Sequence, residues 1–225
     1  AAFRVTPYWK IAGKLRGAST RGIDVDVAGL RFPNPIGLAA GFDKDCRALS
    51  GLLAAGFGYV VGGTVTLQPR PGNARPRMLR IPEDKALLNA LGFPGRGLDA
   101  AERKLSRLSD AERRRVILSV SGTEVDDIVE CHRRLEPLAA GIEVNISSPN
   151  TAGLAVFQEP KALSELIVAV HADAKKPLFV KMPRLQENEE ILELALGASE
   201  SGADGLIVAN TLPIADARLA PGKGG

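Results

Sequence analysis

The sequence predicts an α/β protein, a (β/α)8 TIM barrel of which about six βα units are present in this chain. Apolar runs recur along the chain, with helical patterns between most of them, at residues 36–40, 59–65, 116–120, 142–146, 178–182 and 205–209. The runs are almost entirely apolar, which is typical of parallel strands buried on both faces. A doubly wound sheet is the alternative, but G-x-G-x-x-G is missing after the first run, IGLAAGFDKD.

Length and composition fit one globular domain with a substantial core. The chain has 225 residues, 45% of them hydrophobic and 24% charged. With 29 basic and 26 acidic residues, its charge is too balanced to indicate a nucleic-acid partner. Cys46 and Cys131 lie far apart without C-x-x-C spacing, so we expect two free buried thiols and no zinc site. No apolar run approaches the roughly 18 residues that a membrane-spanning helix needs.

The whole chain divides into two segments. Residues 1–22 are mixed in character, with Tyr8 and Trp9 among basic residues, and we interpret them as the remnant of an N-terminal extension. Residues 23–225 then form the barrel, which lacks its last two strands. Within it, residues 23–32 alternate between apolar and polar and predict a hairpin ahead of the first barrel strand.

Three of the intervening segments carry a clear helical stripe of apolar residues. The first stripe spans residues 125–138, with Thr123 and Asp126 at the spacing of a capping box. The second spans residues 163–170, and Pro160 suits the first turn of that helix. The third stripe is formed by Ile191, Leu194, Ala195 and Ala198.

Functional groups of a barrel come from the carboxyl ends of its strands. The expected strand ends carry small residues, hydroxyls, amides and lysines, namely Ala40, Gly41, Lys44, Thr64, Ser119, Lys181, Ala209, Asn210 and Thr211. Small residues let a planar ligand approach the backbone, and the lysines favour an anion or a ring that becomes anionic. Taken alone, Lys44 is typical of a solvated surface charge.

The fourth run leads into the most polar segment, GIEVNISSPNTAGL at residues 141–154. Pro149 biases Ser148 away from the helical region, so the strand should open into a loop there. Asn145, Ser148 and Asn150 place neutral donors and acceptors together, which suits a flat polar heterocycle. An Asx or Ser turn capping the next helix is the alternative from local chemistry. The six compatible strand ends together favour the ligand site.

Several blocks resemble the dihydroorotate dehydrogenases: NPIGLAAGFDKD, GFGYVVGGTVTLQPRPGNARPRMLR, NISSPNTAGL, FVKMP and DGLIVANT. They follow the family order across about residues 30–212. The resemblance implies an FMN-containing barrel that oxidises (S)-dihydroorotate to orotate in pyrimidine biosynthesis. GFDK together with Ser148 in SSPN is similar to class 2, whose members reduce quinone, because class 1 carries Cys at that position. It therefore implies a quinone partner and a peripheral position on the cytoplasmic side of the membrane, reached through the N-terminal extension.

The same resemblance implies a role for each matching residue. Ser148 would be the catalytic base, and no metal would take part. The substrate would be bound by Lys44, Asn89, Asn145, Asn150, Asn210 and Thr211. FMN would be bound by Ala40, Gly41, Lys44, Thr64, Ser119, Asn145, Lys181 and Ala209.

The chain departs from the class 2 pattern in places. LSVSG places Ser119 where Asn is usual, and Ala209 stands where Thr is common. NALGFPG lacks the Arg and the second Asn of the usual NRxGFN block, which leans towards class 1. Because flavin phosphates in barrels bind near the last two strands, we expect this chain alone to hold FMN weakly.

Three other functions stay open from the sequence. A different dihydropyrimidine-like substrate would account for the altered NALGFPG block. A dihydrouridine synthase-like barrel acting on RNA would account for the basic run of Arg70, Arg75, Arg77 and Arg80. An inactive barrel fragment is the third alternative, since six units leave the edges of an eight-stranded sheet exposed.

Overall fold

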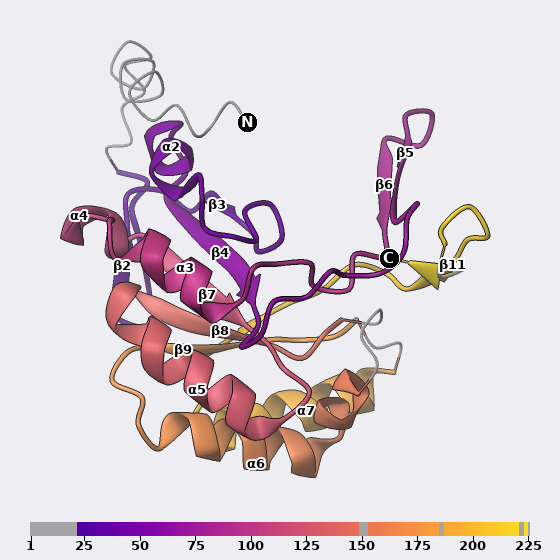
Figure 1. The fold of residues 1–225 in the computed structure, drawn as a ribbon. Helices are drawn as coiled ribbons and strands as arrows, with labels where there is room; N and C mark the ends of the chain where they lie inside the picture. Colours follow the sequence, from indigo (N-terminus) through magenta and orange to yellow (C-terminus); the bar gives the residue numbers. More distant parts are fainter. Residues whose placement is uncertain (1–21, 149–152, 185–186, 221–222, 225) are drawn as a thin grey trace.

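The computed structural model describes residues 22–148, 153–184, 187–220 and 223–224 (Figure 1). Its centre is a six-stranded parallel sheet with the order β10-β9-β8-β7-β4-β3, which forms part of a barrel. The strands are β3 (Gly37–Leu38), β4 (Tyr59–Val65), β7 (Val116–Val120), β8 (Gly141–Asn145), β9 (Leu178–Lys181) and β10 (Gly205–Ile207). Each coincides with one of the six apolar runs, so the predicted parallel α/β architecture is confirmed.

Helices cover the outer face of this sheet. They are α2 (Leu49–Ala54), α3 (Leu98–Leu105), α4 (Asp110–Arg113), α5 (Val125–Leu135), α6 (Pro160–His171) and α7 (Asn188–Glu200), with 3₁₀ turns η2 (Glu136–Leu138) and η3 (Leu154–Gln158). Figure 1 shows α5, α6 and α7 along one face of the sheet. Outward strand residues such as Leu118 and Val144 join Ile128 and Leu166 of these helices in the main core. Cys46 and Cys131 are buried and unbridged, as expected.

Of the two helix N-termini predicted from the sequence, one is confirmed and one is wrong. Pro160 opens α6, as its fixed φ angle favours. The predicted capping box of Thr123 and Asp126 is wrong, because the N-cap of α5 is Glu124 and no side chain caps it. The extended backbone of Glu124 delays the helix by one residue, so Thr123 lies outside it. A capping box occurs instead on α4, between Ser109 and Glu112.

The inner face of the sheet changes character along the strands. Near the amino ends, Val61, Ile117 and Phe179 pack with Phe32. Phe32 belongs to the antiparallel hairpin β1 (Val25–Val27) and β2 (Leu30–Phe32), so the predicted hairpin is confirmed. Towards the carboxyl ends the inner residues become polar, which prepares a site at that edge.

A second hairpin, which the sequence analysis did not predict, interrupts the connection between β4 and β7. It consists of β5 (Met78–Ile81) and β6 (Ala86–Asn89) and projects beyond the sheet (Figure 1). The chain after β10 packs against it, with Leu219 buried against Leu88 and Ala90. A short pair, β11 (Ile214–Ala215) and β12 (Lys223–Gly224), completes this region.

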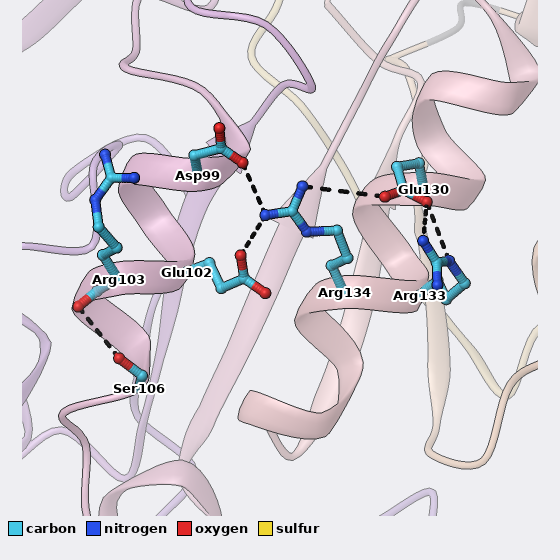
Figure 2. A network of polar contacts seen from close by, with 7 residues as sticks. All are labelled: Asp99, Glu102, Arg103, Ser106, Glu130, Arg133 and Arg134. Atoms are coloured by element: carbon cyan, nitrogen blue, oxygen red, sulfur yellow. Dashed lines mark hydrogen bonds and ion pairs between the residues drawn. The ribbon is translucent and has the colours of Figure 1, made fainter.

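An ion-pair network joins α3 to α5 on the surface (Figure 2). Arg134 of α5 donates to Asp99, at 2.7 Å between Nη2 and Oδ1, and also to Glu102 of α3. Glu130 accepts two hydrogen bonds from Arg133 one helical turn away. Because exposed pairs contribute little stability, we expect the network to align the two helices more than to hold the fold together.

His132 is a buried base on the inner side of α5. Its side chain is 2% exposed, and neither ring nitrogen has a hydrogen-bond partner among the described residues. Nε2 lies 3.7 Å from Oε1 of Glu136, which already accepts the backbone N–H groups of Lys175 and Lys176. Burial lowers the pKa of His132, and the negative charges of Glu136 and Asp173 only partly oppose this.

We predict that His132 makes the protein sensitive to mild acid. In the unfolded chain it takes up a proton near pH 6.5, whereas the buried ring does so only at lower pH. The stability that the neutral, buried His132 ring contributes is therefore fully present above pH 6.5. It is lost as the pH falls through the lowered pKa of His132 in the folded protein. Urea unfolding at pH 7.5 and 5.5 should show a smaller acid-induced loss of unfolding free energy in His132→Leu than in wild type. The exposed His171, changed to Gln, is the comparison variant and should keep most of the wild-type loss, because its charge is the smallest of the causes that lower the His132 pKa. Equal losses in wild type and His132→Leu would contradict the prediction.

Candidate active site

A cavity of about 590 Å³ opens at the carboxyl ends of the strands. Its walls come from the ends of β3, β4, β8, β9 and β10 and from the β5–β6 hairpin. The volume falls within the range of small-molecule and cofactor sites. The sequence-predicted residues that line it are Ala40, Gly41, Lys44, Thr64, Asn89, Asn145, Ser148, Lys181, Ala209, Asn210 and Thr211.

Two predicted residues are not among those lining the cavity. Asn150 lies outside the described residues, so its placement is left open. Ser119 is fully buried on β7, and its hydroxyl oxygen lies 2.9 Å from that of Thr64. Ser119 therefore reaches the cavity through Thr64 rather than directly.

The backbone of β4 explains how Thr64 is presented. The pairing of β4 with β7 shifts between Gly62 and Val65, an irregularity that re-aims side chains. At Gly63 the φ angle is +110°, and a Cβ atom would lie 2.5 Å from the carbonyl oxygen of Ser119. Only glycine allows the two strands to approach this closely, and the approach brings Thr64 beside Ser119.

Asn145 is held by a buried hydrogen-bond network at the end of β8. Its Nδ2 donates to Thr64 Oγ1 at 3.1 Å, and its Oδ1 accepts from the backbone N–H and hydroxyl of Ser147. The Ser121 hydroxyl donates to its carbonyl oxygen at 2.7 Å. The amide is therefore fixed in orientation before any ligand arrives.

The loop after β10 is tied to the loop that carries Ser148. Asn210 Nδ2 donates to the carbonyl oxygen of Ser147 at 2.7 Å, and its backbone N–H donates to Met182. Residues more than sixty positions apart in the chain thus meet at one wall of the cavity. This hydrogen bond joins Asn210 to the residue before Ser148, and Thr211 lines the same cavity as Ser148, which the sequence spacing alone does not show.

Two lysines bring positive charge to the cavity. Asp43 holds the Lys44 loop by accepting the backbone N–H groups of Arg47 and Ala48 at 2.9 and 2.6 Å. Burial lowers the pKa of Lys44, and the positive charges of Lys181 and Arg77 lower it further. Lys181 itself is only 9% exposed. Because like charges repel in a partly desolvated site, this arrangement favours a ligand with negative charge.

The β5–β6 hairpin supplies cavity residues that the sequence analysis missed. Met78, Arg80 and Leu87 line the cavity together with Asn89 at the end of β6. The segment MLRIPEDKALLN carries a usable signal, since two apolar-rich stretches flank a polar turn. Arg77 on the preceding loop donates to the carbonyl oxygens of Pro71 and Asn73. One arginine of the basic run is therefore engaged in holding its own loop.

Within the described part of the chain, no three His, Cys, Asp or Glu side chains are grouped to hold a metal ion. Among those same residues, no helix has the length and apolar character to cross a membrane.

Comparison with known proteins agrees with this architecture. The curated dihydroorotate dehydrogenase (quinone) of Leifsonia xyli subsp. xyli is 41% identical over 223 residues, covering 94% of this chain and 65% of the relative. The enzyme of the same name from Mycobacterium marinum is 39% identical over 228 residues, covering 99% of this chain and 63% of the relative. The chain thus spans slightly less than two thirds of the length of these relatives.

Solved structures show the same fold. The ligand-free DHODH from Eimeria tenella matches with a TM-score of 0.80 and 32% identity, covering 97% of this chain and 70% of that one. Its complex with ferulenol matches with the same TM-score and identity, covering 95% of this chain and 67% of that one. The family model described as dihydroorotate dehydrogenase matches residues 23–219. Since that match extends over most of the chain, the protein belongs to the dihydroorotate dehydrogenase family.

Proposed function

We propose that this chain carries the flavin and substrate site of a quinone-dependent dihydroorotate dehydrogenase, which oxidises (S)-dihydroorotate to orotate in pyrimidine biosynthesis. The observation that carries the proposal is the single cavity in which two lysines, fixed amides and Ser148 converge. Its chemistry suits a flat polar ring together with an anionic heterocycle. Membership of the family supplies the reaction.

The residues present fit an FMN ring. Ala40 and Gly41 offer backbone without a bulky side chain, and Gly41 has a φ angle of +103° that favours glycine. Thr64 and Asn145 offer oriented polar groups for the edge of the ring, and Ser119 supports Thr64 from behind. Lys181 would stabilise negative charge on the ring by preorganised electrostatics. Ala209 completes the proposed set, and FMN when bound supplies the hydride acceptor.

The remaining polar residues fit dihydroorotate. Lys44 would pair with its carboxylate, which relieves the repulsion between the two ammonium groups. The amides and hydroxyl proposed to orient the ring are those of Asn89, Asn145, Asn150, Asn210 and Thr211.

Ser148 is the proposed base for the proton on C5 of the substrate, while the hydride leaves from C6. A free serine hydroxyl is a weak base near neutral pH, so Ser148 must pass a proton onward as it accepts one. The tether between Asn210 and Ser147 brings the Thr211 hydroxyl to the same wall. Thr211 or a water molecule is therefore the proposed next proton carrier.

The electron acceptor is proposed from the relatives, whose names specify quinone. Peripheral contact with the cytoplasmic side of the membrane would involve residues 1–22, nearly all of which lie outside the described residues. Residues 23–225 form the proposed barrel domain.

Replacing Ser148 by Ala tests the reaction and its base together. In the full-length gene product loaded with FMN under anaerobic conditions, dihydroorotate should bleach the flavin absorbance. Ser148→Ala should slow that bleaching by about 10²–10⁴-fold, the usual contribution of a general base, with little change in orotate affinity. Ser148→Cys should retain part of the rate and work at lower pH, because a thiol ionises more readily than a hydroxyl. Bound flavin that stays oxidised in the wild type would refute the proposed substrate.

Replacing Lys44 by Met should weaken orotate binding by roughly 10–100-fold, the usual contribution of a hydrogen bond to a charged group. In the wild type the affinity should fall as the pH rises through the Lys44 pKa, which lies below its ordinary value of 10.5. In Lys44→Met the orotate affinity should not fall further as the pH rises. In Lys44→Arg, which stays charged, the affinity should also stay constant with pH and should remain close to that of the wild type. Orotate titrations between pH 7 and 10 measure these effects; an unchanged affinity in Lys44→Met would rule out the pairing with the carboxylate.

A further inference from the structure

A buried carboxyl group lies beneath the cavity and has no part in the chemistry proposed above. Glu143 lies on the inner face of β8, two residues before Asn145, and is 1% exposed. Its Oε1 atom has no hydrogen-bond partner among the described residues. The carboxyl group does take part in a hydrogen bond with Ser119. A buried carboxylate that is only partly hydrogen-bonded is still unfavourable, so a positively charged group nearby would stabilise it.

The strand register places Lys181 as that group. Asn145 pairs with Lys181 across β8 and β9, so Glu143 lies one inward position below that pair. A second cavity, of about 390 Å³, lies towards the amino ends of the strands and is lined by both Glu143 and Lys181. These two are the charged residues among its lining, and the others include Phe32, Val61, Ile117 and Phe179. Opposite charges attract strongly in such apolar surroundings.

Lys181 is the charged residue that the two cavities share. Together with Ala39 it lines both the candidate active site and the second cavity, whereas Glu143 lines only the second one. Burial raises the pKa of Glu143, and the charge of Lys181 and a hydrogen bond with Ser119 oppose the rise. An effect of Glu143 on the active site would therefore pass through Lys181.

We propose that Glu143 is a positioning residue that pairs with the Lys181 ammonium from below and limits the positive charge that Lys181 presents to the flavin. The part concerning the flavin rests on the proposed function, whereas the attraction between Glu143 and Lys181 involves this chain alone. Lys181 favours a reduced flavin that carries negative charge, and Glu143 weakens that preference. Removing the carboxylate should therefore raise the midpoint potential of the bound flavin.

The ion pair is tested without flavin by a double-mutant cycle on the flavin-free full-length gene product. Glu143→Gln, Lys181→Gln and the double variant are unfolded in urea at pH 8. Each single change leaves one buried charge without its partner, so the double variant should be more stable than the sum of the two effects. We expect a coupling of at least tenfold in the unfolding equilibrium constant. If the effects of the two single substitutions on the unfolding free energy simply add, the proposed pairing is wrong.

A folding failure also gives a clear result. If Glu143→Gln alone does not fold, the double variant must fold again, because it buries neither charge. A double variant that fails as well would overturn the pair.

The effect on the flavin is measured as the midpoint potential of the FMN-loaded protein at pH 8. Glu143→Gln should raise the ratio of reduced to oxidised flavin at least tenfold, or about 30 mV for a two-electron couple. In a Lys181→Gln background the same change should have little effect. Glu165→Gln, which removes an equal charge from the exposed face of α6, should leave the potential unchanged. An unchanged or lowered potential in Glu143→Gln would overturn the proposal, and so would an equal shift in the Lys181→Gln background. A wild type that takes up no FMN would refute the proposed function. The interaction between Glu143 and Lys181 would then be decided by the double-mutant cycle in urea.

Discussion

Parallel pairing of six strands is the constraint on which the rest of this structure depends. Because each strand runs in the same direction, all six carboxyl ends open at one edge of the sheet. The outer face is apolar and covered by helices, so functional groups are confined to the inner face and to the loops at that edge. Residues far apart in sequence, such as Lys44 and Lys181, meet there for this reason.

The inner face of the sheet divides into an apolar part near the amino ends of the strands and a polar part near their carboxyl ends. Phe32, Val61, Ile117 and Phe179 form the apolar part, and Thr64 and Asn145 hydrogen-bond to each other in the polar part. Burial strengthens electrostatic interactions and makes a buried charge without compensation unfavourable. The proposed attraction between Glu143 and Lys181 follows from the same burial.

The hairpin between β4 and β7 adds residues to the cavity that the parallel sheet begins. Its hairpin carries Asn89, Arg80 and Met78 to the cavity, while the sheet supplies Thr64, Asn145 and Lys181. Functional variation within barrels is concentrated in such loops, because they alter the ligand pocket without disturbing the strands. The departures from the class 2 pattern fit this division, since NALGFPG begins at the end of the hairpin.

The sequence by itself determined the six parallel strands, the first hairpin, three of the helices and most of the segments that line the site, because periodicity, proline and local polar clusters are encoded in neighbouring residues. The six apolar runs and Pro160 are examples. Only the tertiary structure decided that Ser119 lies behind Thr64, that α5 begins after Glu124 rather than after Thr123, and that Glu143 lies below Lys181. Two of these depend on strand register and on a bulge at Gly63, and the third on where a backbone turns helical. Such choices depend on packing between distant segments, which a local pattern of residues does not contain.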